Sequence, residues 1–378
     1  MSTTILQQAL TLEAITLSHH RLRLAKPLRT AAATFESRET LLLRVTIKTR
    51  DGERHEGFGE AAPLSGWSGE TIGGIQGLTH EIEYPLDMRS VADLDQHLPQ
   101  LTASPVLRFG IELSILDALA RAAGLPLCTA LFNARPSRKP DLHPRGSVPV
   151  QFTLGAESVE ACIRVLDTAA DSGYTHAKLK VGVAPCDADL TRVREIIKRC
   201  PRLTLRLDAN GAWTTEQALG MLISLPRERV ELIEQPVADQ DLPGLLERYD
   251  GSGPRIAADE SCASLNQARA LIRSGRLGAI VVKPSVVGGL LPASAMFELA
   301  LRHRVQVIIS NLMESAVGRR AIAHLAAAWP EIPGPHGLAT GQWLAEDLCP
   351  AADQLNHGKL IPGRTPGIGF RPVAAGSE

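Results

Sequence analysis

From about residue 147 onward, short strand-like runs alternate with helical stretches, and each run ends in a polar residue. The runs include "HAKLKVG", "RLTLRLDAN" and "VELIEQP", and helical stretches such as "DADLTRVREIIKRC" separate them. The polar residues recur every 24 to 28 positions, at Lys180, Asp208, Glu234, Asp259, Lys283 and Ser310. A strand–helix unit that repeats at this length, on strands apolar enough to be buried on both faces, predicts a parallel α/β barrel.

An open, doubly wound sheet is the competing architecture. Its strand order reverses at a switch point, so it does not usually bring six consecutive strand ends to one focus. The chain also contains neither GxGxxG nor GxxxxGK[ST], the motifs that favour a nucleotide-binding sheet. In a barrel, the carboxyl ends of the strands surround the mouth of the active site. The six polar residues are therefore expected to become neighbours around a ring.

The part of the chain before the repeat has a different pattern. Residues 14–62 show strand-like alternation with "RDGE" as a turn signal, and residues 69–133 carry apolar residues at helical spacing. Strands followed by helices predict a small α+β domain that ends near residue 130.

Composition excludes several classes of function. The formal net charge is −1 and only 4% of residues are aromatic, which argues against a nucleic-acid partner. The chain has no run of eighteen apolar residues, so we expect no membrane span. The N-terminus does not have the pattern of a signal peptide. The six scattered cysteines predict reduced thiols in a cytoplasmic protein.

Three carboxylates, Asp208, Glu234 and Asp259, come from adjacent strand ends. Carboxylates that point into one mouth repel each other unless a cation lies between them. An oxygen-only ligand set favours Mg²⁺, with Mn²⁺ as the alternative, and leaves coordination positions for substrate oxygens. A lone Asp at such a position more often caps the following helix, but three in register favour the metal site.

Lys180 precedes this triad and Lys283 follows it, so the two lysines are expected to face each other across the ring. Alternation along a strand places Lys178 on the same face as Lys180. A lysine acts as a base near neutral pH when neighbouring cations and partial desolvation lower its pKa. This combination suits removal of a proton α to a carboxylate, with a metal ion that stabilises the resulting enediolate.

The strings "KLK", "DANGAW", "EQP", "ADES" and "KPSVVGGL", in this order and spacing, resemble the muconate-lactonizing-enzyme subgroup of the enolase superfamily. The resemblance covers nearly the whole chain. It implies an α/β protein with a modified TIM barrel, (β/α)7β, and an α+β capping domain. The domains are then expected to be a cap at 1–130, a catalytic barrel at 131–345, and a segment at 346–378 that returns to the cap.

The same resemblance implies roles for residues within these strings. Lys180 is the expected general base, Lys178 its electrostatic partner, and Lys283 the lysine on the opposite face. Asp208, Glu234 and Asp259 are the expected metal ligands, with Asn210 and Glu260 hydrogen-bonded around them.

Two further strings, "GFGEAAPLSGWSGET" and "HGLATGQWLAEDL", resemble o-succinylbenzoate synthases. These enzymes dehydrate 2-succinyl-6-hydroxy-2,4-cyclohexadiene-1-carboxylate to 2-succinylbenzoate in menaquinone biosynthesis.

The implied partner is a small carboxylate substrate. Its predicted contacts are Arg38 in the cap and Ser310, Ser315, Gly318, Gly288 and Gly289 at the barrel mouth. For the two serines, a local turn or helix-cap hydrogen bond is an equal alternative. Trp67 and Trp213 are candidates to line the pocket, although packing is the commoner role of tryptophan.

Two other functions stay open at this point. An N-acylamino acid racemase or dipeptide epimerase would use the same two lysines, but dipeptide epimerases usually carry an acidic "DxD" where this chain reads "GPHGLAT". A non-catalytic scaffold on an inherited barrel is a different class, and five mutually dependent charged groups argue against it. The sequence leaves open whether the chain forms a homo-oligomer.

Overall fold

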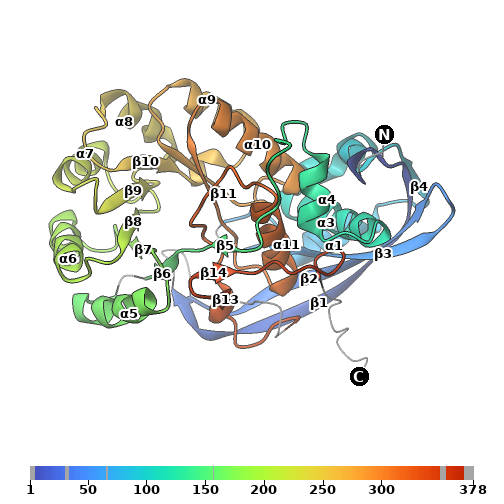
Figure 1. Ribbon diagram of the computed structural model, residues 1–378, viewed down its shortest axis with the longest axis horizontal. Helices are drawn as coiled ribbons and strands as arrows, with labels where there is room; N and C mark the ends of the chain where they lie inside the picture. The colour runs from blue at the N-terminus through green and yellow to red at the C-terminus, as the bar shows by residue number, and fades with distance from the viewer. Residues whose placement is uncertain (1–4, 30–33, 65–66, 156, 350–354, 370–378) are drawn as a thin grey trace.

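The computed structural model describes residues 5–29, 34–64, 67–155, 157–349 and 355–369. Figure 1 shows a strand-rich cap and a ring of strands and helices side by side. In the cap, the antiparallel sheet has the order β3-β2-β1-β4. Its strands are β1 (Leu10–Arg29), β2 (Thr34–Thr49), β3 (Arg54–Ala61) and β4 (Leu86–Met88).

The cap helices cover one face of this sheet. They are α1 (Ile72–His80), α2 (Leu94–His97), α3 (Pro105–Ala122) and α4 (Leu127–Ala134), with the 3₁₀ turns η1 (Ile5–Gln7), η2 (Val91–Asp93) and η3 (Pro99–Ala103). Helix α3 is buried over most of its length. It lies so close to β3 that a Cβ atom at Gly57 or Gly59 would collide with its backbone. Glycine is required there because only a residue without a side chain permits this approach.

The second sheet is parallel, with the order β12-β11-β10-β9-β8-β7-β6. Its strands are β6 (Phe152–Leu154), β7 (His176–Lys180), β8 (Thr204–Asp208), β9 (Val230–Glu234), β10 (Arg255–Ala258), β11 (Ala279–Val282) and β12 (Gln306–Ile309). The helices that alternate with them are α5 (Val159–Asp171), α6 (Cys186–Arg199), α7 (Thr215–Ser224), α8 (Leu242–Arg248), α9 (Leu265–Arg273), α10 (Leu290–Arg302) and α11 (Ala316–Ala327). The predicted period of strand and helix is therefore present.

The segment at His336 and Gly337 lies between the two edges of this sheet. Gly337 N donates to Ile309 O at 2.8 Å beside β12, and Gln151 N donates to His336 O at 2.9 Å beside β6. Parallel bridges pair Ser310 with Gly337 and Val150 with His336. This short segment takes the place of an eighth strand, which agrees with the predicted (β/α)7β barrel. Short 3₁₀ turns η4 (Asp239–Asp241), η5 (Glu260–Cys262) and η6 (Gly341–Trp343) lie in the connecting loops.

The barrel strands are almost fully buried because helices cover their outer faces and apolar side chains fill the interior. The interior cluster consists of Leu232, Ala257, Ala279, Val281 and Ile308. Charged side chains gather at the carboxyl end of the barrel, where such barrels place their active site. A further ion pair lies lower in the sheet, between the buried Arg206 of β8 and Glu231 of β9.

The chain returns to the cap after the barrel. Strands β13 (Leu355–Asn356) and β14 (Lys359–Leu360) pair with β5 (Val148–Pro149). Further along, Gly367 O accepts from Leu127 N at 2.8 Å, and Ile368 N donates to the Asp117 carboxylate at 2.7 Å. Both partners belong to the cap, as the predicted returning segment requires. The domain boundaries 1–130, 131–345 and 346–378 stay predictions.

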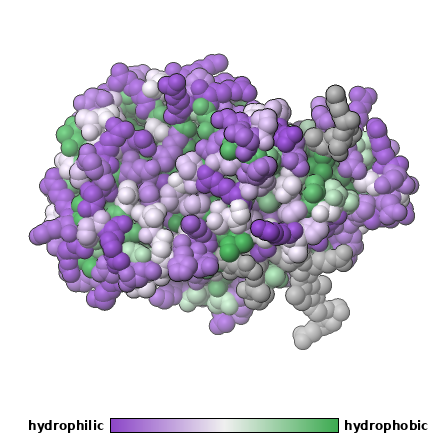
Figure 2. Space-filling view, viewed as in Figure 1, coloured by the Kyte–Doolittle hydropathy of each residue, from purple (hydrophilic) through white to green (hydrophobic). Residues whose placement is uncertain are grey.

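The face shown in Figure 2 is largely hydrophilic, with small scattered apolar areas rather than one broad patch. Among the described residues, no helix is long and apolar enough to span a membrane.

Candidate active site

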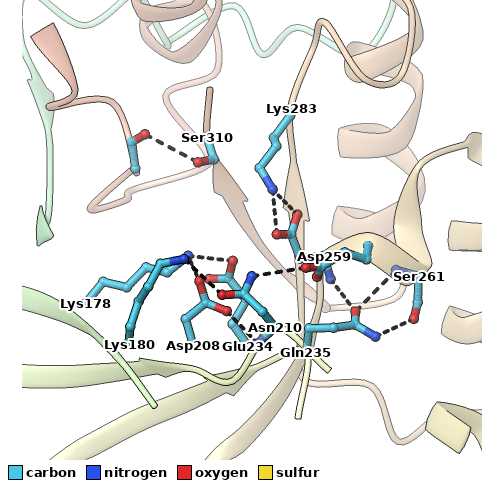
Figure 3. Close-up of polar contacts among 12 residues, drawn as sticks. Lys178, Lys180, Asp208, Asn210, Glu234, Gln235, Asp259, Ser261, Lys283 and Ser310 are labelled. Atoms are coloured by element: carbon cyan, nitrogen blue, oxygen red, sulfur yellow. Dashed lines mark hydrogen bonds and ion pairs between the residues drawn. The ribbon is translucent and has the colours of Figure 1, made fainter. Parts of the chain in front are cut away.

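Parallel pairing aligns the polar strand ends. Lys180 pairs with Asp208, Asp208 with Glu234, and Glu234 with Ala257, two residues before Asp259. Because parallel strands in register end at the same edge, side chains that are distant in sequence meet at one mouth. Figure 3 shows the predicted lysines and carboxylates clustered above the strands. The structure therefore brings Lys178, Lys180, Asp208, Glu234, Asp259 and Lys283 together.

Lys178 bridges two of the carboxylates. Its Nζ lies 2.8 Å from Asp208 Oδ2 and 2.6 Å from Glu234 Oε1. Burial alone would lower the pKa of Lys178, but the nearby Asp208, Glu234 and Asp259 outweigh burial and raise it. Lys178 is therefore protonated at neutral pH and acts as a fixed positive charge beside Lys180.

Lys283 occupies the opposite side of the cluster. Its Nζ lies 2.6 Å from Asp259 Oδ1 and 2.5 Å from Oδ2. The ring of Trp67, in the cap loop before α1, lies over the same ammonium group, 3.7 Å from Nζ to the ring centroid. The structure thus places Trp67 at the mouth, whereas Trp213 is buried.

Lys180 donates to Asn210 Oδ1 at 3.1 Å, and Asn210 Nδ2 donates to Glu260 Oε1 at 3.1 Å. Asn210 N also donates to Asp208 Oδ1 at 3.1 Å. Asn210 has φ 44°, in the left-handed region where asparagine is enriched. This local turn places its amide between Lys180 and Glu260. The roles of Asn210 and Glu260 around a metal site stay predictions.

The donor set of the cluster suits a hard divalent cation. All the acidic groups offer oxygen, and Glu260 Oε2 is buried without a hydrogen-bond partner. Burial, with Asp208 and Asp259 adding repulsion, outweighs Lys178 and raises the pKa of Glu234 to about 8. At Asp208, burial is outweighed by the nearby lysines, Lys178 above all, and the pKa is lowered. An added cation would favour the charged form of Glu234 as well.

The described residues nevertheless contain no group of three His, Cys, Asp or Glu side chains already arranged around one metal position. The reason is visible in Figure 3, where the ammonium groups of Lys178 and Lys283 lie against the carboxylates. Asp208, Glu234 and Asp259 would hold the ion once these ammonium groups shift, and their role as metal ligands stays a prediction.

Two of the predicted substrate contacts instead bind a carboxylate of the cap. Ser315 N and Oγ donate to Glu60, both at 2.7 Å, and Gly318 N donates to Glu60 Oε2 at 2.8 Å. Thr40 Oγ1 donates to Glu60 Oε1 at 2.7 Å. Glu60, from β3, thus occupies the N-terminus of α11, where the amides and helix dipole favour an anion. The helix-cap alternative describes Ser315 in this structure.

A second cap carboxylate, that of Glu112, lies beside Gly288 and Gly289. Gly288 O accepts from Arg108 Nη1 at 2.5 Å, and Leu291 N donates to Glu112 Oε1 at 3.0 Å. Gly289 has φ 152°, and a Cβ atom there would lie 2.5 Å from the Glu112 carboxylate. Glu112 of α3 therefore occupies the N-terminus of α10.

Arg38 lies buried between the cap and the barrel. Its guanidinium donates to Leu312 O and Met313 O, each at 3.3 Å, and to the carbonyls of Ala62 and Pro63. All these acceptors are backbone groups, so Arg38 here fastens the cap loop to the loop after β12. Its predicted contact with substrate stays a prediction.

Neutral polar groups lie at the barrel mouth directly after β12 and around the segment at Gly337. Ser310 Oγ donates to Gly337 O at 3.4 Å, and Asn311 Nδ2 donates to Thr340 Oγ1 at 2.8 Å. Glu314 is nearby, but its carboxylate accepts from Ser285 Oγ at 2.5 Å within the protein.

Comparison with known proteins gives the family. The model of the family described as "Enolase C-terminal domain-like" matches residues 161–375. The chain belongs to the enolase superfamily. It is 25% identical over 366 residues to o-succinylbenzoate synthase of Bacillus subtilis (strain 168), covering 95% of this chain and 93% of the relative. It is 30% identical over 372 residues to hydrophobic dipeptide epimerase of Citrifermentans bemidjiense, covering 93% of this chain and 95% of the relative.

A solved structure agrees with this assignment to the enolase superfamily. The dipeptide epimerase of Enterococcus faecalis V583, crystallised with Mg and the dipeptide L-Leu-L-Tyr, is 25% identical and superposes with a TM-score of 0.82. The match covers 95% of this chain and 99% of that chain. The superfamily is therefore established, while its relatives include both lyases and epimerases.

Sequence reasoning missed three residues that shape this superfamily site: Glu60, Glu112 and Gln235. Gln235, directly after Glu234, is 1% exposed and has φ 38°. The "EQP" string contained it, but its contacts with Asp259 and Ser261, 24 and 26 positions later, follow from the barrel and not from the string.

Proposed function

We propose that this member of the enolase superfamily is an o-succinylbenzoate synthase, a carbon–oxygen lyase of menaquinone biosynthesis. It would convert 2-succinyl-6-hydroxy-2,4-cyclohexadiene-1-carboxylate to 2-succinylbenzoate and water. The observation that carries the proposal is the pair of lysines on opposite sides of one carboxylate cluster, with neutral groups at the adjoining mouth. Six free cysteines suit the predicted cytoplasmic location.

Lys180 is the proposed base because its Nζ contacts the neutral amide of Asn210 rather than a carboxylate, and its neutral amine form would accept the proton. In the reaction, Lys180 removes the proton on the ring carbon that bears the carboxylate. The electrons of that C–H bond first move into the carboxylate, which becomes a planar enediolate. They then form a ring double bond as the C–O bond of the hydroxyl group breaks. The hydroxide leaves with the proton from Lys180 as water, and the ring becomes aromatic.

Lys283 lies on the other side of the cluster, where its positive charge stabilises the planar intermediate from the opposite face. Lys178, which bridges Asp208 and Glu234, adds a fixed positive charge to the same cluster. Mg²⁺ held by Asp208, Glu234 and Asp259 would supply further positive charge at the substrate carboxylate. Mn²⁺ has the same ligand preference and is the alternative.

The mouth near the last two strands supports the synthase over a dipeptide epimerase. A dipeptide carries an ammonium group, which a carboxylate pair would bind. In this chain Asn311 and Thr340 form a neutral hydrogen bond there, and the Glu314 carboxylate is occupied by Ser285. Neutral donors suit an uncharged carbonyl or a carboxylate, as the succinyl group provides.

An epimerase is the second candidate. The two opposed lysines would exchange an α-proton between the faces of an N-acylamino acid or dipeptide, and the hydrophobic dipeptide epimerase is among the relatives. A scaffold role is less well supported, because it gives no reason to bury this number of charged groups.

Loss of the diene absorbance, measured with purified protein and Mg²⁺, tests the proposal. We expect turnover by the wild type and a loss of at least 10³-fold in Lys180→Ala and Lys283→Ala. Lys198→Ala, at an exposed position of α6, is the matched control and should retain full activity. Proton–deuterium exchange into N-succinylamino acids and dipeptides, run in parallel, reports epimerase activity. Exchange without dehydration would contradict the synthase assignment, and cation binding without either reaction would contradict both enzymes.

A further inference from the structure

Gln235 connects three strand ends through its backbone. Its N–H donates to Ala257 O of β10 at 2.8 Å, and its carbonyl accepts from Gly211 N, beyond β8, at 2.7 Å. Gln235 itself follows Glu234, the last residue of β9. It is therefore hydrogen-bonded to both neighbours of the strand that carries the central carboxylate.

The side-chain amide makes a second set of contacts. Its Oε1 accepts from Asp259 N at 3.1 Å and from Ser261 N at 3.2 Å. Its Nε2 donates to Ser261 Oγ at 2.7 Å, to Val237 O at 2.9 Å and to Asp239 Oδ1 at 3.3 Å. Figure 3 shows this amide directly beneath Asp259.

The chemistry of these partners requires an amide. Two backbone N–H groups need an acceptor, and a carbonyl and a carboxylate need a donor, so neither a carboxylate nor an apolar side chain satisfies both sides. The left-handed φ of Gln235 costs about 1–3 kcal/mol in general and persists only where the surroundings enforce it. The cost indicates that this conformation is held by the contacts on both sides.

We propose that Gln235 is a positioning residue that fixes the separation of the strand ends bearing Asp208, Glu234 and Asp259, and thereby sets the affinity for a divalent cation. The inference rests on the metal site of the proposed function. Mg²⁺ demands nearly ideal octahedral geometry, so a small shift of one carboxylate weakens binding. Residues that orient metal ligands typically change metal affinity by about 10–100-fold when they are replaced.

The test measures cation affinity rather than turnover. Mn²⁺ is titrated and free Mn²⁺ followed by electron paramagnetic resonance, and Mg²⁺ is titrated by calorimetry. The variants are Gln235→Leu, which removes the hydrogen bonds, and Gln235→Glu, which keeps the shape and adds a negative charge. Gln240→Leu, at an exposed position five residues later, is the matched control.

We expect the dissociation constant to rise about 10–100-fold in Gln235→Leu and to stay within twofold of wild type in Gln240→Leu. Gln235→Glu separates geometry from charge. Its carboxylate repels Val237 O and the Asp239 carboxylate, so positioning predicts weaker binding, whereas a purely electrostatic role predicts tighter binding. Unfolding in urea with a chelator records any loss of stability separately.

Ser261→Ala is the second variant, in case Gln235→Leu does not fold. It removes only the hydroxyl that accepts from Gln235 Nε2, and we expect about 3–10-fold weaker binding. Folded Gln235→Leu or Ser261→Ala protein with wild-type affinity would overturn the positioning role. A wild type that binds neither cation would instead overturn the metal site of the proposed function.

Discussion

The ring of Trp67 lies over the ammonium group of Lys283, with 3.7 Å between the ring centroid and Nζ. Trp67 belongs to the cap, and Lys283 directly follows a barrel strand. This contact therefore places the cap loop against the proposed reacting groups. The other side of the same ammonium group faces Asp259.

Replacing Trp67 should therefore change the reaction through Lys283. A cation–π contact is worth about 0.5–2 kcal/mol, depending on desolvation. We expect Trp67→Leu to lower kcat/KM for dehydration by about 10-fold, and Trp67→Phe to lose less because it keeps an aromatic face. The diene assay measures both. Equal losses in the two variants would show that the volume of the ring matters and its π-system does not.

Lys178 should be essential for the stability of the metal-free protein. Its ammonium neutralises Asp208 and Glu234, which are 3% and 2% exposed. Removing one partner of such a buried cluster costs about 3–5 kcal/mol. We predict this loss for Lys178→Met in urea unfolding with a chelator, and partial recovery on adding Mg²⁺. Lys198→Met should stay within about 0.5 kcal/mol of wild type. An unchanged midpoint for Lys178→Met would argue against a buried, charged lysine.

The repeat along the chain was sufficient to predict this cluster, because it depends on strand period and register alone. Lys180, Asp208 and Glu234 are aligned by parallel pairing, and strand alternation places Lys178 beside Lys180. The partners of Ser315 and Gly318 were beyond such reasoning. Glu60 is about 255 positions away, and only the docking of the cap determines that its carboxylate fills the α11 N-terminus. The arrangement of the three carboxylates around a cation also could not be predicted from the sequence, because it depends on where the lysine side chains lie.

Glu60 should contribute strongly to stability although it takes no part in the reaction. Its carboxylate accepts four hydrogen bonds, and hydrogen bonds to charged groups are worth about 1.5–3 kcal/mol each. Glu60→Gln places an NH₂ group against these donors, so we expect a loss of about 2–4 kcal/mol by urea unfolding. Glu56→Gln, on the same strand and exposed, is the matched control and should change little. Similar effects in the two variants would contradict the anchoring role.

His336 should make stability fall as the pH is lowered. Burial, helped by the charges of Arg206 and Arg145, lowers its pKa to about 3, and its Nδ1 accepts from Ile309 N. Between pH 6.5 and 3 the unfolded chain binds a proton at this residue and the folded protein does not. The free energy of unfolding therefore decreases with falling pH by about 1.4 kcal/mol per pH unit from this residue.

The variant His336→Asn retains an acceptor for Ile309 N and has no proton to gain. Urea unfolding at several pH values between 6 and 4 should show a slope shallower than wild type by about 1.4 kcal/mol per pH unit. Other acid-sensitive groups, including the buried His324, are common to both proteins and cancel in the difference. If the free energy of unfolding had the same pH dependence in both proteins, His336 would be protonated in the folded state as readily as in the unfolded chain.

Glu60 and Glu112 insert cap carboxylates into the starts of the last two barrel helices. A barrel expressed without its cap would therefore expose the amide groups at the starts of those two helices. A cap expressed alone would lose the backbone amides that Glu60 and Glu112 accept from. Cap and barrel thus complete each other at these two helix starts. The anchors lie outside the loop that carries Trp67, between β3 and α1. The contact with the reacting groups, made by Trp67, and the anchoring by Glu60 and Glu112 are therefore made by separate parts of the cap.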